Sequence, residues 1–156
     1  MSYLDIISLS DAKTYLRIDD DLNDDDLQIE SMIKSALSYL ERRTNHILYS
    51  RDKTYLFQEG ELRVYDYPIN SVTDSDGYKS YKNVMYTLYE ADNISTKTLT
   101  ANVGYTDVSD VPQELINAGL YLIKIYYYEA ETDKANKGDL PSWLNDTINQ
   151  YKRFIF

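Results

Sequence analysis

Residues 113–130, QELINAGLYLIKIYYYEA, are the segment that most limits how this chain can fold. Pro112 suits the first turn of a helix, and the helix that follows is apolar on nearly every side. The apolar positions are Leu115, Ile116, Ala118, Leu120, Leu122, Ile123 and Ile125. Such a helix has to lie at the centre of its domain or be covered by another subunit. The tyrosines at 126–128 cannot all face one core, because consecutive helical residues point in different directions.

Gly119 lies in the middle of this predicted helix, where glycine costs roughly 1 kcal/mol relative to alanine. One interpretation is a tolerated imperfection. The other is the close approach of a second helix, next to Ala118. The sequence leaves both open.

An amphipathic helix is predicted upstream, from about residue 24 to residue 43. Its apolar residues form one stripe at helical spacing: Ile29, Met32, Ile33, Ala36, Leu37 and Leu40. The basic pair Arg42 and Arg43 suits its C-terminal end. A shorter helix precedes it in LSDAKTYLRI, with Ser10 as the expected N-cap, and a last helix begins near residue 141.

Residues 47–108 change to short runs rich in β-branched and aromatic residues, which predict a small antiparallel β-meander. We therefore expect an α+β fold that is mainly helical, with this meander inserted in the middle. The helical part comprises an N-terminal helical hairpin, a long central helix and a C-terminal helix. We expect residues 1–156 to form one domain, helical over 8–45 and 111–153.

The acidic run RIDDDLNDDDLQIE, residues 17–30, comes close to the ligand register of a calcium-binding EF-hand loop. The ligand positions of that motif are occupied by Asp19, Asp21, Asn23 and Glu30. The position that needs glycine for its sharp turn is Asp24, however, and the chain has no second loop of this type. These departures favour another interpretation.

The same run also has the pattern of a helix start. Asn23 or Asp24 can cap a helix by accepting a hydrogen bond from a free backbone N–H. Asp25 and Asp26 would then sit in the first turn, where the helix dipole favours carboxylates. On this interpretation, replacing Asp24, Asp25 or Asp26 by asparagine costs at most about 1 kcal/mol each.

Composition limits the class of protein. A chain of 156 residues, 43% of them hydrophobic, can bury a sizeable core, and the absence of cysteine excludes disulfides and thiolate chemistry. No apolar run approaches the ~18–20 residues that span a membrane, so we expect no membrane association. The opening MSYLDIISLS lacks the pattern of a signal peptide. A net charge of −10 opposes direct binding to nucleic acid.

No catalytic constellation can be recognised. His46 is the only histidine, so it cannot form a zinc site of ordinary composition, and no nucleophile motif accompanies it. We expect His46 at the surface or at a helix end. The five glycines are too widely spaced for a phosphate-binding loop. We therefore expect no enzymatic activity, no cofactor and no metal.

The order of these elements resembles the bacteriophage head–tail connector (adaptor) family, in its longer members with a β-rich middle segment. That family opens with a Leu-x-x-Ala-Lys-x-x-Leu-Arg segment, an acidic loop and an amphipathic helix that ends near Glu-x-x-Thr. The residues that fit this pattern are Leu9, Ala12, Lys13, Leu16, Arg17, Asp19, Asp20, Asp25, Leu27, Ile33, Ala36, Leu40, Glu41 and Thr44. Three later pieces also look like the family, in the same order: YPINSVT, VGYTDVSDVPQELINAGLYLIKIYYYE and LPSWLNDTINQYKR.

The resemblance implies a structural protein of the virion neck, assembled in the bacterial host cytoplasm. Family members form a ring of about twelve subunits by head-to-tail contacts. The ring docks below the portal, extends the DNA channel and provides a platform for the next neck or tail-completion protein. DNA would pass through without specific binding.

Two surfaces are candidates for this role. The first is an interface with the ring or the portal: Leu120, Ile123, Tyr127, Trp143, Phe154, Ile155 and Phe156. The second is the acidic loop: Asp19, Asp20, Asp21, Asp24, Asp25 and Asp26. It would line the channel, where like charge lets DNA slide, or lie on the outer surface. We also expect that deleting residues 153–156 leaves the fold intact and weakens assembly.

A different class of protein is also compatible with the sequence. Tyrosine accounts for 17 of 156 residues, and its ring with a polar hydroxyl suits half-wet interfaces. The alternative is therefore an acidic, tyrosine-rich protein-binding adaptor that acts as a monomer or dimer.

Overall fold

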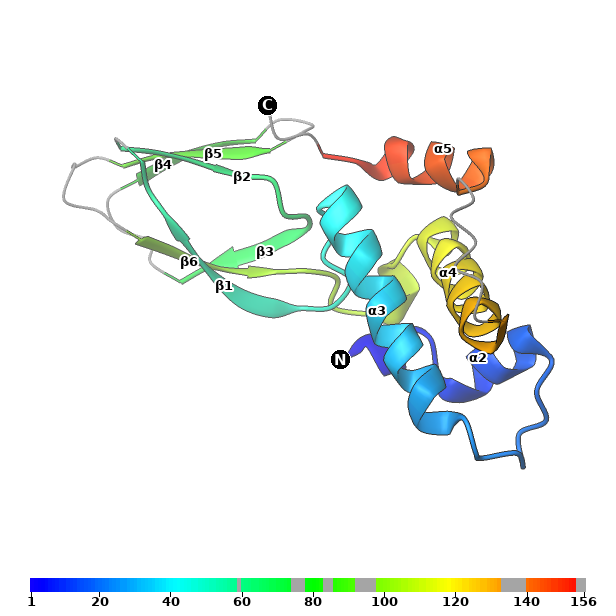
Figure 1. Cartoon of the computed structure of the whole chain (residues 1–156). Helices are drawn as coiled ribbons and strands as arrows, with labels where there is room; N and C mark the ends of the chain where they lie inside the picture. The colour runs from blue at the N-terminus through cyan, green and yellow to red at the C-terminus, as the bar shows by residue number, and fades with distance from the viewer. Residues whose placement is uncertain (59, 74–77, 83–85, 92–97, 133–139, 154–156) are drawn as a thin grey trace.

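The computed structural model describes residues 1–58, 60–73, 78–82, 86–91, 98–132 and 140–153. The helices gather at one end of the molecule and the strands at the other (Figure 1). The helices are α1 (Tyr3–Ile6), α2 (Leu9–Leu16), α3 (Asp26–Thr44), α4 (Gln113–Thr132) and α5 (Ser142–Tyr151), with a 3-10 turn η1 (Val108–Asp110) before α4. The strands are β1 (Arg51–Leu56), β2 (Glu61–Val64), β3 (Ile69–Val72), β4 (Tyr78–Lys82), β5 (Thr87–Ala91) and β6 (Thr98–Val103).

The predicted α+β class is confirmed, and every strand pair is antiparallel. The strands form two three-stranded sheets, β1-β6-β3 and β2-β5-β4, instead of one meander. The decisive pair is β1 with β6, in which Arg51 lies opposite Val103. This long-range pair brings the two ends of the β region together, so α3, which precedes it, lies beside α4, which follows it.

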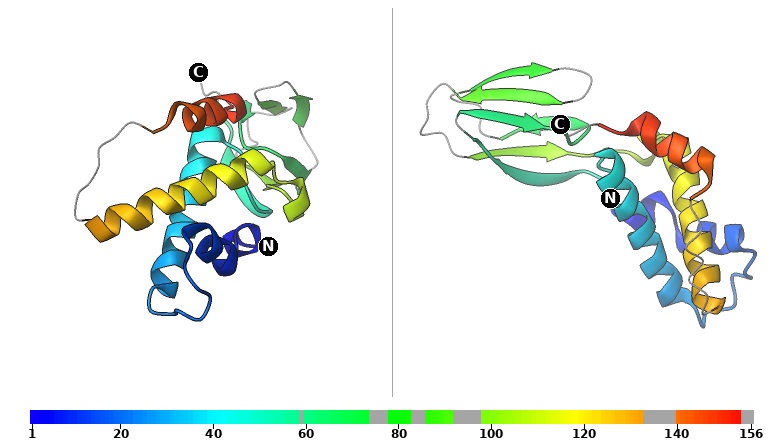
Figure 2. Two further views of the ribbon diagram at one scale, coloured as in Figure 1. Left: turned by 90° about the vertical axis from the view of Figure 1, so that its right-hand side faces the viewer. Right: turned by 45° about the horizontal axis from the view of Figure 1, so that its top comes forward.

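Helix α4 lies at the centre of the helical end, which explains why its sequence is apolar nearly all round. It packs on α3, α2 and α5, and Figure 2 shows it running between α5 and α2. Leu115, Ala118 and Ile123 are completely buried. The stripe predicted on α3 faces this core: all of its residues are fully buried except Met32, which is half-buried.

Gly119 marks a close approach, so the second of the two interpretations is correct. A Cβ at this position would lie 2.9 Å from Leu37 Cδ2 and 3.0 Å from Ile7 Cδ1. Both distances are shorter than ordinary carbon–carbon contact. The missing side chain therefore lets α4 pack tightly against α3 and the α1–α2 connection.

The helix starts differ from the prediction in their caps. Ser8, not Ser10, caps α2, because its hydroxyl accepts a hydrogen bond from the Asp11 N–H while Asp11 reaches back to the Ser8 N–H. The residue before α3 is Asp25, and its side chain makes no capping hydrogen bond. Neither Asn23 nor Asp24 is the cap. Helix α1 and strand β4 were not expected from the sequence.

A buried carboxylate, that of Glu41, joins three elements. Its oxygens accept hydrogen bonds from the Tyr3 hydroxyl at 2.7 Å and from the Leu48 backbone N–H at 2.7 Å. Arg51 donates to both oxygens, at 3.1 Å and 2.6 Å. Burial lowers the pKa of Arg51, but the hydrogen bond and charge of Glu41 outweigh this and raise it. The Glu41 carboxylate therefore joins helix α1, the end of α3 and the start of β1.

His46 lies just after the end of α3, which was one of its two expected places. It is buried where the two ends of the molecule join, which corrects the other expectation, a surface histidine. Its Nδ1 lies 2.8 Å from the Tyr105 hydroxyl, and its ring packs edge-on against Tyr151. Tyr67 stacks beside it at a tilted angle. Burial, with the charge of Arg153, lowers the pKa of His46 to about 4, so the imidazole is neutral in the folded protein at neutral pH.

The segment after α5 is fastened to the end of α3. The Arg153 backbone N–H donates to the Thr44 carbonyl at 3.0 Å, and the Asn45 side-chain amide donates to the Arg153 carbonyl at 2.6 Å. The Arg153 guanidinium lies 4.9 Å from the centre of the Tyr67 ring. Arg153 is therefore part of the fold, and a deletion that includes it removes structural contacts as well as the three residues that follow.

The buried imidazole predicts a pH dependence of stability. The unfolded chain takes up a proton on His46 near pH 6.5, whereas the folded chain resists it until about pH 4. The free energy of unfolding should therefore fall by about 2 kcal/mol from pH 7 to pH 5 through this group. Since the chain has no other histidine, His46→Gln should remove that part of the slope in denaturant titrations. Equal slopes for both proteins would contradict the assignment.

Candidate assembly surfaces

The acidic loop, here residues 17–25 between α2 and α3, begins at a left-handed residue, Arg17, whose φ is 63°. All the aspartates of the loop are exposed, and Asp26, the first residue of α3, is half-buried. Tyr127 reaches the loop from α4, and its hydroxyl donates to Asp25 Oδ2 at 3.0 Å. The structure therefore brings the two predicted surfaces into contact at Tyr127 and Asp25.

The loop closes over a buried lysine. Lys13 on α2 is only 2% exposed, and its ammonium lies 2.7 Å from Asp26 Oδ1. The ammonium also donates to the Asp20 carbonyl at 3.1 Å and to Asn23 Oδ1 at 3.4 Å. Asp26 Oδ1 is shielded from water and has no hydrogen-bond partner other than this ion pair. The acidic sequence is thus folded around an internal cation, as a buried ammonium requires.

This arrangement argues against the EF-hand interpretation. Asn23 Oδ1, one of the expected ligands, faces the Lys13 ammonium, and Glu30 lies 3.8 Å from Lys34 on the same helix. Among the residues that the structure describes, no group of three or more histidine or acidic side chains could hold a metal ion. Lys13 supplies the positive charge inside the loop.

The predicted interface residues separate into four groups. Trp143 is exposed and packs edge-on against Tyr121 with ring centres 5.0 Å apart. Leu120 and Tyr127 are half-buried. Ile123 has no exposed surface because it packs into the helical core, so its assignment to an interface is corrected. Phe154, Ile155 and Phe156 lie outside the described residues.

A groove of ≈ 410 Å³ lies between the α1–α2 segment and α4. It is lined by Ile6, Ile7, Asp11, Thr14, Tyr15, Gln113, Ile116 and Leu120. Leu120 is the predicted interface residue that it contains. The groove is mainly aliphatic and aromatic, which suits a protein contact better than a polar ligand.

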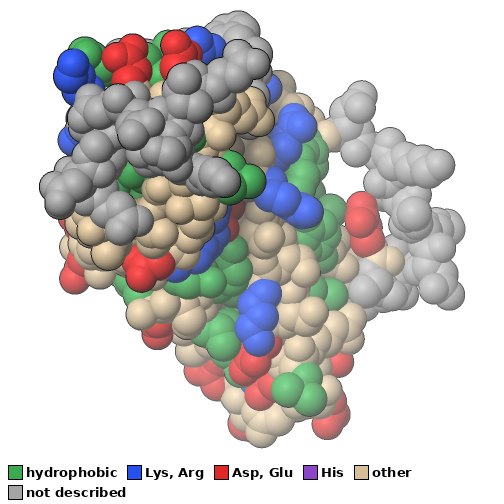
Figure 3. Space-filling model, turned by 90° about the vertical axis from the view of Figure 1, so that its left-hand side faces the viewer, with side chains coloured by type: hydrophobic (Ala, Val, Ile, Leu, Met, Phe, Trp, Pro, Cys, Tyr) green, Lys and Arg blue, Asp and Glu red, His purple; other side chains and the backbone are tan. Residues whose placement is uncertain are grey.

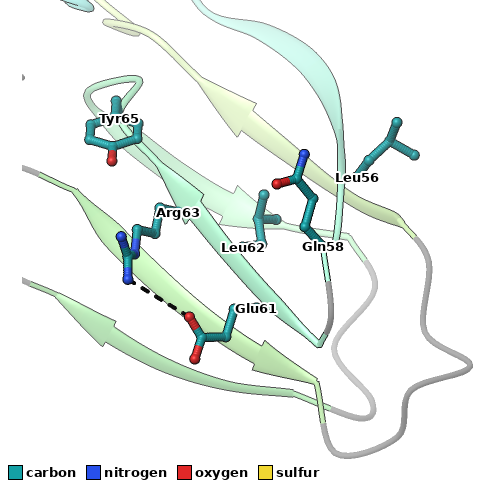
Figure 4. Close-up of a pocket in the computed structure, with 6 residues that line it drawn as sticks. All are labelled: Leu56, Gln58, Glu61, Leu62, Arg63 and Tyr65. Atoms are coloured by element: carbon teal, nitrogen blue, oxygen red, sulfur yellow. Dashed lines mark ion pairs between the residues drawn. The ribbon is translucent and has the colours of Figure 1, made fainter. Parts of the chain in front are cut away.

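A larger hollow of ≈ 760 Å³ lies at the β end. It is lined by Leu56, Gln58, Glu61, Leu62, Arg63 and Tyr65. In Figure 4, Glu61 and Arg63 extend from β2 to the same side and form a 3.8 Å ion pair, while Leu56 lies apart from them. Among the described residues, this lining holds neither a nucleophile with a base nor a pair of carboxylates.

A basic face on α3 was missed by the sequence interpretation, which treated Arg42 and Arg43 only as helix-end charges. Lys34, Arg42 and Arg43 are all exposed, whereas the one acid among residues 31–43, Glu41, is buried. Lys34 and Arg42 line a shallow hollow of ≈ 460 Å³. Figure 3 shows basic side chains in a column on one face of the molecule and acidic side chains gathered at its lower end. The helical spacing of these cations in the sequence could have indicated the basic face.

Comparisons with known proteins point to one kind of assembly. A family model described as phage gp6-like head-tail connector protein matches residues 6–95, more than half of the chain. No curated protein sequence matches the chain. None of the helices in the described part of the chain is long and apolar enough to cross a membrane.

Similar folds occur in solved structures of gene transfer agent particles. A chain from the neck of an empty particle, solved with C6 symmetry, has a TM-score of 0.75 at 16% identity. A chain from the native virion has a TM-score of 0.75 at 17% identity, and one from a native neck solved with C12 symmetry has 0.71 at 15%. Each comparison covers 97% of this chain and 91% of the other. At these identities the likeness shows the fold.

The ion pair between Lys13 and Asp26 changes the effect that we expect from substitutions in the acidic run. Asp26→Asn should cost about 2–3 kcal/mol of unfolding free energy, because it leaves a buried ammonium without its countercharge. Asp24→Asn is the matched control and should stay within about 0.5 kcal/mol, since Asp24 is exposed. Chemical denaturation of the two variants tests the difference. Equally small losses would show that Lys13 is not held as an ion pair.

Proposed function

Because the chain belongs to the phage gp6-like head-tail connector family, we propose that it works as a ring-forming adaptor in the neck of a phage-like particle. The observation that carries the proposal is the family match, which covers the helical hairpin and most of the β region. The fold agrees over nearly the whole chain with neck proteins solved with C6 and C12 symmetry. The chain is accordingly a structural head–tail connector of the virion.

The surface of the subunit supports assembly into a closed ring. A ring is built from head-to-tail contacts, in which one face of a subunit meets a different face of its neighbour. We assign this role to the acidic loop with Leu22 and Leu27, which are 57% and 84% exposed, and to the exposed basic side chains of α3. We assign about twelve copies to the ring, in line with the C12 symmetry of the neck that shares the fold.

The proposed partners follow from this position. One rim of the ring would meet the portal, and the other would receive the next neck or tail-completion protein. Leu120, Tyr127, Trp143 and residues 154–156 remain the proposed contacts. With a net charge of −10 on each subunit, the ring would repel phosphate, so DNA would pass through without specific binding. No catalysis is required of the protein, and assembly would take place in the host cytoplasm.

We further propose that the helical and β ends act as one unit, residues 1–156, within the ring. Support comes from the two buried contacts that join them, Glu41 with Arg51 and His46 with Tyr105. A unit with two fixed ends can transmit a docking force from the portal to the tail without bending.

Ring formation is the direct test of the proposed function. Native mass spectrometry and electron microscopy of the purified chain, alone and with its portal protein, should show closed rings of about twelve copies. A particle that stays a monomer or dimer, even with the portal present, would refute the ring. That result would favour the alternative of an acidic protein-binding adaptor.

Two C-terminal truncations give a sharper test than the deletion of residues 153–156 alone. Removing residues 154–156 should leave the unfolding free energy within about 0.5 kcal/mol and reduce ring or portal binding. Removing Arg153 as well should cost about 2 kcal/mol more, because its bonds to Thr44 and Asn45 are lost. Denaturation and ring assembly would be measured on both truncations. If the protein without residues 154–156 assembles fully, these residues are not part of the proposed interface.

A further inference from the structure

We propose that, in the ring, the tip of the acidic loop of each subunit docks into the basic hollow on α3 of the next subunit. This inference rests on the proposed function, because it needs a head-to-tail ring. It places the loop between neighbouring subunits, a location different from the channel wall and from the free outer surface.

The receiving surface is the outward stripe of α3. Ser31, Lys34, Ser35, Ser38 and Arg42 follow one another at helical spacing, and Tyr3 and Tyr126 flank them in the same hollow. Three of the five stripe residues are serines, whose short side chains leave the helix surface low between its cations. An incoming loop can therefore approach the α3 backbone closely.

The cations of this hollow are not used within the subunit. Arg42 makes no hydrogen bond or ion pair within the part of the chain that the structure describes. Lys34 is 55% exposed at its side chain and has only the long 3.8 Å contact with Glu30. Both charges are thus available to a partner, and an exposed pair such as Lys34–Glu30 contributes little that would have to be given up.

The docking tip carries the complementary charge and apolar anchors. The side chains of Asp19, Asp21 and Asp24 are exposed and make no hydrogen bond or ion pair with any described residue. Leu22 and Leu27 project beside them, and Leu27 is 84% exposed. Buried apolar anchors surrounded by charge pairs are what a specific protein contact uses.

The tip is held in place for docking by contacts inside its own subunit. Lys13 binds the loop from within, and Tyr127 donates to Asp25 from α4. These contacts use Asp20, Asp25 and Asp26 and leave the other three aspartates free. A loop ordered before docking loses less conformational entropy when it binds, which favours association.

Charge complementarity selects a second copy of this chain as the occupant. The loop and the hollow lie on one polypeptide, so every neighbour in a ring supplies both members of the contact. Duplex DNA is the other anionic candidate for the hollow. It is disfavoured because the chain has a net charge of −10 and the described part of α3 presents three cations here, Lys34, Arg42 and Arg43.

A charge-swap experiment tests the contact. One variant carries Lys34→Glu and Arg42→Glu, and a second carries Asp21→Lys and Asp24→Lys. A third combines all four substitutions. The matched control is Lys79→Glu with Lys82→Glu on β4, which makes the same charge change on exposed residues of the other end. Ring fraction would be measured by native mass spectrometry and sedimentation, with portal protein where wild type needs it, and thermal melting would check folding.

Each double variant should lower the ring fraction by about tenfold, and the combined variant should recover to within about threefold of wild type. The β4 control should assemble like wild type. Unchanged assembly of the Lys34–Arg42 variant would overturn the proposal, and so would failure of the combined variant to recover. If the Lys34–Arg42 variant loses binding to duplex DNA while its rings stay intact, the hollow is a DNA contact instead. A wild-type chain that forms no ring at all would refute the proposed function itself.

Discussion

The buried carboxylate of Glu41 holds together the parts of this protein that lie far apart in sequence. An ion in the protein interior is tolerated only where donors replace the water that it has lost. Here the donors come from the Tyr3 hydroxyl, the Leu48 backbone and Arg51. The N-terminal turn, the third helix and the first strand must therefore take up one relative arrangement, because any other leaves a buried charge without partners. The rest of the fold is built on this point.

A second internal charge, the ammonium of Lys13, does the same for the acidic loop. Lys13 pairs with Asp26 and binds two further oxygens of the loop, so a run of aspartates that would otherwise repel one another is held in one conformation. Both charges belong to the Leu-x-x-Ala-Lys and Glu-x-x-Thr segments in which the chain resembles head–tail connectors. Those segments therefore contribute to the fold through buried electrostatics.

The distribution of apolar surface fits a subunit that works in an assembly. Helix α4 satisfies most of its apolar side chains within the subunit, through α2, α3 and α5. The apolar sequence of α4 is therefore not evidence that another subunit covers this helix. The large hydrophobic side chains that stay exposed among the described residues include Leu22 and Leu27 beside the acidic loop, Leu56 at the β end and Trp143 on α5. They lie at separate places on the subunit, as contacts with more than one neighbour would require.

The sequence by itself determined the α+β class, the presence of helices near residues 24–43 and 113–130, and the connector family, because helical periodicity and residue spacing are local properties. It did not determine that β1 pairs with β6, that Ile123 is buried, or that His46 is internal. Ser8 replaced Ser10 as the cap of α2 for a similar reason, since a cap depends on which side chain is free to turn toward the helix. Tertiary structure alone decided that Lys13 sits beneath the aspartates and that Arg42 faces outward. Burial and ion pairing depend on residues that are distant in the chain, and a periodic pattern carries no information about which of them will meet.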